Sequence, residues 1–234
     1  MKRFVLILVL ITAIFIVEAN EFERLKTIEA RGIQNPDLYY NLGVTYWQTG
    51  QSGMATLYFL KTLNLNSAHK LAKENLNYAL NLSQDRDLYT SKLFLVDLFM
   101  QVYDYMNLNR LALLSLVFLL FACISFIWFV DYDPNKERGL PSLTFGACLF
   151  FLLISISFLG FKAYRRNHNN LAVLVVESAE LRSEPDASAA RVAQIHEGII
   201  LSMRKVESHW TLVNLPNGQS GWIELRNIAT VIEG

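Results

Sequence analysis

The stretch LYYNLGVTYWQTG, residues 38–50, decides how the first part of this chain folds. Four of its residues recur three and four positions apart and so share one face of a helix: Tyr39, Leu42, Gly43 and Tyr46. Gly50 marks a turn, and Ala55 and Phe59 are spaced to face the first helix from a second one. A small residue such as Gly43 lets helix backbones approach closely while aromatic rings fill the space around them. The stretch therefore predicts a closely packed helix pair.

This helix pair resembles a tetratricopeptide repeat, a unit of about 34 residues. One repeat length further on, Leu42 corresponds to Leu76 and Tyr46 to Leu80, which indicates the first helix of a second, less regular repeat. Three positions depart from the repeat pattern: Thr62, Ser67 and Asn77. We expect a helical domain of this type over residues 20–107.

The resemblance also implies a groove in which the first helix of each pair binds a segment of a partner protein. The expected partner-binding residues are Tyr40, Val44, Trp47, Gln48, Glu74 and Tyr78. Tyrosine and tryptophan supply much of the binding energy at protein interfaces, so Tyr40 and Trp47 are the expected anchors. The alternative is that Trp47 packs against a neighbouring helix, near Phe22 or within residues 88–106.

Residues 88–106 themselves leave two interpretations open. Roughly three repeats are normally needed to bury one another's apolar faces, so an amphipathic helix here would close the helical domain. The same segment carries tyrosines at both ends, which also suits a helix lying on a bilayer surface.

Two later runs contain no charged residue and are long enough to cross a membrane: Leu111–Val130 and Pro141–Phe161. A helix of about 20 residues spans about 30 Å, the thickness of the hydrocarbon layer. We expect transmembrane helices at 108–130 and 141–161, joined by a polar turn at 131–140 and followed by a linker at 162–168. The hydrophobic fraction of the chain, 53%, agrees with this hairpin.

Residues 1–19 have the three parts of a secretory signal: a basic start, an apolar stretch and a small-residue cleavage pattern that ends at Ala19. Cleavage after Ala19 is expected, and an uncleaved anchor is the alternative. Basic residues around the hairpin slightly favour the opposite orientation, but the first apolar segment usually dominates. We therefore expect a multi-pass protein of the bacterial inner membrane. Its turn at 131–140 would be cytoplasmic, and both flanking domains would lie in the periplasm or otherwise outside the cytoplasmic membrane.

From residue 169 the pattern changes to alternation with frequent turns, which predicts short antiparallel strands and a small barrel over 169–234. The strands are expected to break at 196–198, 207–208 and 216–218. Three stretches resemble a bacterial SH3 domain: LRSEPDASA, HEGIIL and HWTLVNLPNGQSGWI.

The SH3 resemblance implies core positions at Leu181 and Trp222 and a role in binding cell-wall peptides or proline-rich segments. Trp210 is the best single candidate for a contact residue on the surface, with packing as its alternative role. The contact residues of this domain are not otherwise assigned by the sequence.

Catalysis and nucleic-acid binding find no support in the residues. The formal net charge is zero and no basic stripe is present, which argues against nucleic acid as a partner. The two cysteines, Cys123 and Cys148, lie in apolar runs, and the four histidines lack ligand spacing. No nucleophile–base pair or phosphate-binding loop is recognisable. We expect a protein that is not an enzyme and holds neither a cofactor nor a metal.

The predicted fold class is a multidomain chain: a tetratricopeptide-like helical domain, a transmembrane helical hairpin and an all-β, SH3-like barrel. This order, with LYYNLGVTYW and the SH3 stretches, resembles the BatE family of the bacterial aerotolerance operon. The resemblance implies an envelope scaffold that works with von Willebrand factor A membrane proteins and a MoxR-type AAA+ ATPase in oxidative-stress tolerance. The alternative is a cell-wall tether in which the SH3-like domain binds peptidoglycan.

Overall fold

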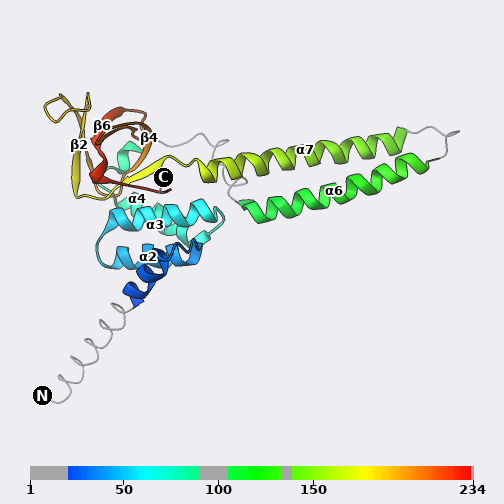
Figure 1. Ribbon diagram of the computed structural model, residues 1–234, viewed down its shortest axis with the longest axis horizontal. Coiled ribbons are helices and arrows are strands. Elements are labelled where there is room, and N and C mark those ends of the chain that lie inside the picture. Colours follow the sequence, from blue (N-terminus) through cyan, green and yellow to red (C-terminus); the bar gives the residue numbers. More distant parts are fainter. Residues whose placement is uncertain (1–20, 90–104, 133–138, 233–234) are drawn as a thin grey trace, which may run out of the picture. The chain divides into compact units, whose positions relative to one another are not determined.

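The computed structural model describes residues 21–89, 105–132 and 139–232 (Figure 1). The expected signal segment at 1–19 and residues 90–104 lie outside the described residues, as do positions 133–138 of the expected turn. The chain divides into two compact units. We name them the head unit (Met1–Leu65, His69–Ser91 and Asn170–Gly234) and the hairpin unit (Asn66–Ala68 and Lys92–Asn169).

The first part of the head unit is helical. A helix at residues 21–30 is followed by α2 (Pro36–Gln48), α3 (Ser52–Leu65), α4 (Lys70–Leu82) and the short 3-10 helix η1 (Arg86–Leu88). Asn35 starts α2, because its side-chain oxygen accepts hydrogen bonds from the N–H groups of Asp37 and Leu38, at 2.7 and 3.3 Å. The turn after α2 contains Gly50 at a φ of 79°, the left-handed conformation that suits a helix end.

The predicted close approach of the first helix pair is confirmed. Leu42 on α2 and Ala55 on α3 are fully buried. A Cβ atom at Gly43 would lie only 2.7 Å from the ring of Phe59, so no side chain fits between the two helices at this point. The sequence pattern therefore identified the packing surface of this pair correctly.

The second part of the head unit is one antiparallel sheet of seven strands. They are β1 (Leu171–Leu174), β2 (Ser178–Arg182), β3 (Arg191–His196), β4 (Ile200–Glu207), β5 (Trp210–Asn214), β6 (Ser220–Glu224) and β7 (Ile228–Thr230). A 3-10 helix, η2 (Leu225–Asn227), precedes β7. The predicted breaks at 196–198, 207–208 and 216–218 fall between β3 and β4, between β4 and β5, and between β5 and β6. The three-residue strand β7 was not expected from the sequence pattern.

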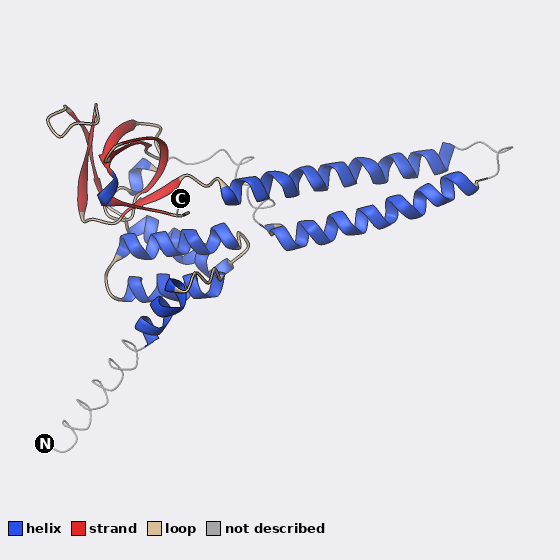
Figure 2. Cartoon of the chain, viewed as in Figure 1, coloured by secondary structure: helices blue, strands red, loops and turns tan. Residues whose placement is uncertain are grey.

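The strand order in the sheet is β3-β2-β6-β5-β4-β1-β7. The two end strands, β3 and β7, are not paired with each other among the described strands, so the sheet is open and the expected closed barrel is not confirmed. Figure 2 shows that the strands curl strongly, as expected when right-handed twist accumulates over a small sheet.

The expected core positions of the sheet are only partly correct. Leu181 is fully buried, but Trp222 is only half-buried. Alternation along β6 explains the difference: Gly221 and Ile223 face the core, so the residue between them points to the other face. Gly221 leaves room for Leu181, whose Cβ would lie 2.9 Å from a Cβ at position 221.

The helices and the sheet of the head unit share a hydrophobic core. Val173 on β1 and Val231 after β7 are buried in the same cluster as Leu42, Leu57 and Phe59. Helix α3 contacts β1, and Figure 2 shows this helix next to the sheet. Residues on either side of the hairpin in the sequence therefore fold together into one unit.

The hairpin unit consists mainly of two long helices, α6 (Leu108–Asp131) and α7 (Gly139–Asn167), packed against each other. Small buried residues line the contact, and the hydroxyl of Ser125 donates to that of Thr144 at 3.1 Å. Both helices are long and apolar enough to cross a membrane. Helix α7 runs on to Asn167, through the residues expected as a linker, and ends with Arg165 and Arg166 in its last turn, where cations are favoured.

Candidate binding surfaces

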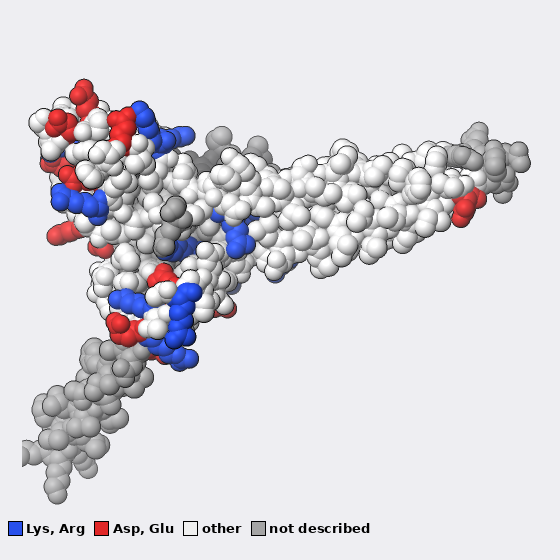
Figure 3. All heavy atoms as spheres, in the orientation of Figure 1, with Lys and Arg blue, Asp and Glu red and all other residues white. Residues whose placement is uncertain are grey.

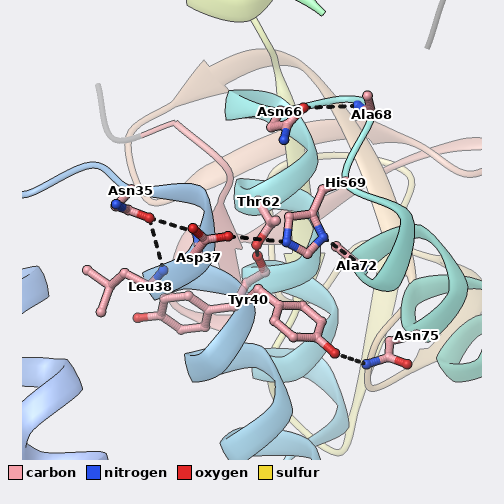
Figure 4. Close-up of polar contacts among 11 residues, drawn as sticks. Asn35, Asp37, Leu38, Tyr40, Thr62, Asn66, Ala68, His69, Ala72 and Asn75 are labelled. Atoms are coloured by element: carbon pink, nitrogen blue, oxygen red, sulfur yellow. Dashed lines mark hydrogen bonds and ion pairs between the residues drawn. The ribbon is translucent and has the colours of Figure 1, made fainter. Parts of the chain in front are cut away.

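The expected groove residues lie on two helices, α2 and α4, and the structure divides them into two groups. Tyr40 belongs to the first group, whose side chains pack against other helices of the head unit (Figure 4). Its hydroxyl accepts a hydrogen bond from the side-chain amide of Asn75 at 3.3 Å, and its ring lies 4.9 Å from that of His69. Because both partners belong to α4 or its cap, Tyr40 links α2 to α4.

A polar contact at the start of the two helices reinforces this link. The Nδ1 atom of His69 accepts a hydrogen bond from the N–H of Ala72 at 3.1 Å and so caps α4. Its Nε2 atom lies 3.5 Å from a carboxylate oxygen of Asp37 in the first turn of α2 (Figure 4). One histidine therefore both starts α4 and contacts the start of α2.

The second group faces outward. The rings of Trp47 and Tyr78 meet edge to face, with centroids 5.8 Å apart, and Tyr78 is 58% exposed. Gln48 and Glu74 are exposed, and Glu74 lies 3.7 Å from the ammonium group of Lys70. Val44 is half-buried against the core beside Trp47. Trp47 is also half-buried against this core, so one part of its side chain packs inside and the other part belongs to the surface.

Sequence reasoning missed two members of this surface, Leu71 and Leu82, which are 53% and 60% exposed. They lie seven residues before and four residues after Tyr78, spacings that return to the same side of a helix. That spacing was available in the sequence as a signal. We define the α2–α4 face by its exposed and half-exposed members: Trp47, Gln48, Leu71, Glu74, Tyr78 and Leu82.

The interface between helices and sheet contains a helix cap supplied from far away in the sequence. The N–H of Gly53, at the start of α3, donates to a carboxylate oxygen of Glu197 at 2.7 Å. A carboxylate is favoured there because helix N-termini present unpaired N–H groups and a positive dipole end. A Cβ at Gly53 would lie 2.5 Å from the carbonyl oxygen of Leu174, so the glycine is required by this contact.

A second polar contact joins η1 to the sheet. The buried carboxylate of Asp85 accepts hydrogen bonds from the backbone N–H of His196 at 2.6 Å and lies 3.0 Å from its Nδ1 atom. Nearby, the hydroxyl of Tyr89 accepts a hydrogen bond from the N–H of Ile200 at 2.9 Å. Burial, assisted by the charge of Asp85, raises the pKa of Tyr89 to about 12, although the hydrogen bond from Ile200 lowers it.

A partly buried ionic cluster joins the helix at residues 21–30 to α3. The hydroxyl of Tyr58 donates to the carboxylate of Glu29, with both oxygens within 2.8 Å, and the ammonium group of Lys61 lies 3.7 Å from the same carboxylate. Burial and the neighbouring carboxylate raise the pKa of Tyr58. Each charge therefore has a partner, and the cluster is a packing feature of the helical part.

The outer face of the β5–β6 hairpin carries the second candidate surface. Leu212 on β5 is directly opposite Trp222 on β6, and Trp210 lies two residues from Leu212 on the same face. All three side chains are half-buried. Trp210 is paired with Glu224 on one side and Glu207 on the other, so carboxylates flank it. We name Trp210, Leu212 and Trp222 the β5–β6 face.

Metal binding has no candidate site in the described part of the chain, where no group of three or more histidine, cysteine or acidic side chains is arranged to hold an ion. Both cysteines, which lie on α6 and α7, are free.

Comparison with known protein families gives one match. Residues 175–229, which include β2 to β6 and most of β7, match the model of the bacterial SH3 domain. No curated protein matches the chain. The match covers the part of the head unit that contains the β5–β6 face, and it supports protein or peptidoglycan binding as the broad role of that part.

Proposed function

We propose that this protein is a non-enzymatic membrane scaffold whose head unit binds other proteins of the cell envelope. The observation that carries the proposal is the α2–α4 face, where Tyr78 and two leucines are exposed and Tyr78 contacts the half-buried Trp47. Contiguous exposed apolar side chains with a polar rim are typical of protein-binding surfaces. The bacterial SH3 match in the same unit supports a binding role.

In this proposal α2, α3 and α4 are one tetratricopeptide-like repeat and the first helix of the next. Helix α3 packs against α2 and α4, and those two helices meet through Tyr40 with Asn75 and Trp47 with Tyr78. This arrangement leaves the α2–α4 face available to a partner. The strongly curled sheet would then be the SH3-like barrel of the same scaffold.

The shared core of the head unit supports a two-pass topology for the hairpin. Residues of the helical part and of the sheet are buried in one hydrophobic cluster, so these two parts must lie on the same side of any membrane. The chain between them must then cross an even number of times, and α6 and α7 supply two crossings. With the signal-like segment at 1–19, we place the head unit outside the cytoplasmic membrane and the turn at 131–140 in the cytoplasm.

The proposed setting is an inner-membrane complex with von Willebrand factor A proteins and a MoxR-type AAA+ ATPase, linked to oxidative-stress tolerance. Its support is the resemblance of the chain to the BatE family. The test is purification of the tagged protein in mild detergent, followed by mass spectrometry of the proteins that accompany it. We expect Trp47→Ala/Tyr78→Ala to lose these partners, while Val206→Ala, an exposed apolar residue on β4, retains them.

Persistence of the same partners with Trp47→Ala/Tyr78→Ala would remove the α2–α4 face from the proposal. Their absence from the wild-type preparation would remove the proposed complex itself.

A second candidate function is a cell-wall tether, favoured by the SH3 match and the β5–β6 face. Aromatic side chains on the outer face of a sheet suit contact with sugar rings and short peptides. The full-length protein should be tested in detergent against purified sacculi, because an isolated sheet fragment would expose Val173 and Val231. The tether is supported if the wild-type protein pellets with the sacculi and the Trp210→Ala variant does not. It is excluded if the wild-type protein fails to pellet.

A further inference from the structure

One end of the hairpin unit carries a concentration of positive charge that the scaffold proposal does not use. Residues 104–110 and 162–169 contain one acidic residue, Asp104, and four basic residues: Arg110, Lys162, Arg165 and Arg166. At the opposite end, residues 131–140 contain three acidic and two basic residues. Figure 3 shows the length of the hairpin between these ends as a surface without Lys, Arg, Asp or Glu side chains.

A hydrogen bond between the helix ends brings the basic residues together. The ammonium group of Lys162, a buried residue of α7, donates to the backbone carbonyl of Met106 at 2.6 Å. Arg110 lies in the first turn of α6, just after Met106, and Arg165 and Arg166 lie in the last turn of α7. The four cations therefore gather where the apolar runs of both helices end. We name these four residues the basic ring.

Two exposed tyrosines accompany the basic ring. Tyr105 and Tyr164 are 67% and 61% exposed. The guanidinium group of Arg110 lies 4.8 Å above the ring of Tyr105 and donates to its backbone carbonyl at 2.9 Å. Tyrosine is enriched at membrane–water interfaces, where its ring lies among the headgroups and its hydroxyl reaches water. In a hairpin inserted in a membrane, the two tyrosines would therefore lie with the basic ring at the depth of the lipid phosphates.

We propose that the basic ring binds the phosphate groups of anionic phospholipids and so gives the hairpin a preference for an anionic lipid environment. Guanidinium groups match the geometry of phosphate oxygens, and basic residues next to membrane helices are attracted to anionic headgroups. A lipid of net negative charge is favoured over a zwitterionic one because its phosphate is not compensated by a choline or amine. The inference rests on the proposed insertion of the hairpin in a membrane.

The test uses the full-length protein reconstituted into phosphatidylcholine vesicles that contain a minority of phosphatidylglycerol. After re-extraction, the lipids that remain bound are quantified by mass spectrometry. We expect phosphatidylglycerol to be enriched over its share in the vesicles, and Arg165→Gln/Arg166→Gln to lower that enrichment roughly tenfold. Arg165→Lys/Arg166→Lys, which keeps the charge, should retain most of it. Lys70→Gln/Lys73→Gln on α4 is the matched control and should change nothing.

Each outcome has a distinct meaning. Equal retention of both lipids by the wild-type protein would overturn the inference while leaving the scaffold proposal intact. Failure to enter vesicles of any composition would instead remove the proposed membrane insertion, and the inference with it. Displacement of the bound lipid by soluble glycerol phosphate would show that the basic ring binds free phosphate esters, which contradicts the assignment to lipid. Circular dichroism of each variant confirms that the helical content is retained.

Discussion

Two glycines show how single residues position the elements of the head unit. Gly43 lets α2 approach the ring of Phe59, and Gly53 lets α3 approach the backbone of β1. Gly43 was recognisable from sequence, because its helical neighbours define the packing face. Gly53 was not, because the carbonyl group that it accommodates, that of Leu174, comes from a strand more than a hundred residues away.

We expect Gly43→Ala to destabilise the head unit. The new Cβ would lie 2.7 Å from two atoms of the Phe59 ring, so either the ring or the helix must move. Overpacking of this kind costs about 1–3 kcal/mol, which exceeds the gain of roughly 1 kcal/mol that alanine brings to a helix interior. Denaturant unfolding followed by tryptophan fluorescence measures the loss. Gly146→Ala on α7 meets nothing within 4 Å and is the control. Equal stability of Gly43→Ala and wild type would contradict the close packing.

The buried hydroxyl of Tyr89 predicts a loss of stability in alkali. Its pKa is raised to about 12 in the folded protein, mainly by burial, so the folded state keeps the proton where an unfolded tyrosine loses it. The stabilisation is complete below pH of about 10 and is lost as pH rises towards about 12, by about 2–3 kcal/mol. Across this pH range, the free energy of unfolding should fall less steeply with pH for Tyr89→Phe than for the wild-type protein. Parallel curves for the two proteins would disprove the assignment.

At the scale of elements, α3 is the centre of the head unit. Nine of its residues are buried, and it contacts α2, α4 and β1. Its first turn is capped by Glu197 from the turn between β3 and β4. The helix itself was predicted from sequence, but its N-terminal partner was not, because a cap supplied by a distant turn leaves no local pattern such as Asn35 provides for α2.

Removal of this distant cap should weaken the first turn of α3. We expect Glu197→Ala to lower the unfolding free energy by about 1 kcal/mol, because a helix N-terminal N–H loses its acceptor and the dipole loses a nearby anion. Hydrogen exchange of the peptide that covers residues 52–58 should accelerate. The control is Glu184→Ala, an exposed residue between β2 and β3. If exchange in this peptide is unaltered, Glu197 does not cap the helix in solution.

At the scale of the whole molecule, the chain folds as a head unit interrupted in sequence by a hairpin. The expected organisation was a linear series of separate segments, and the contacts of Asp85 with His196 and of Tyr89 with Ile200 connect the first part to the last. These contacts, with the shared core, require the helical part and the sheet to lie on one side of a membrane.

Accessibility labelling tests this requirement directly. In a background with Cys123 and Cys148 replaced by serine, single cysteines are introduced as Asn41→Cys on α2 and Asn217→Cys between β5 and β6, both exposed positions. The cells have their outer membrane removed and their cytoplasmic membrane intact. We expect a membrane-impermeant thiol reagent to modify both introduced cysteines in these cells. Modification of one position and protection of the other would contradict the shared core. Protection of both would keep the core and reverse the proposed orientation.

The sequence alone determined the local features of this protein: the close helix pair at Gly43, two helices long enough to span a membrane, and the turns between β3 and β6. Each of these depends on neighbours within about one or two elements, where periodicity and turn residues are informative. The tertiary structure alone decided that Tyr40 is a packing residue, that Trp222 faces outward, and that helices and sheet share one core. Those facts depend on contacts between residues far apart in the chain. A pattern of apolar residues indicates that one side of an element is buried, but it does not identify the element that packs against that side.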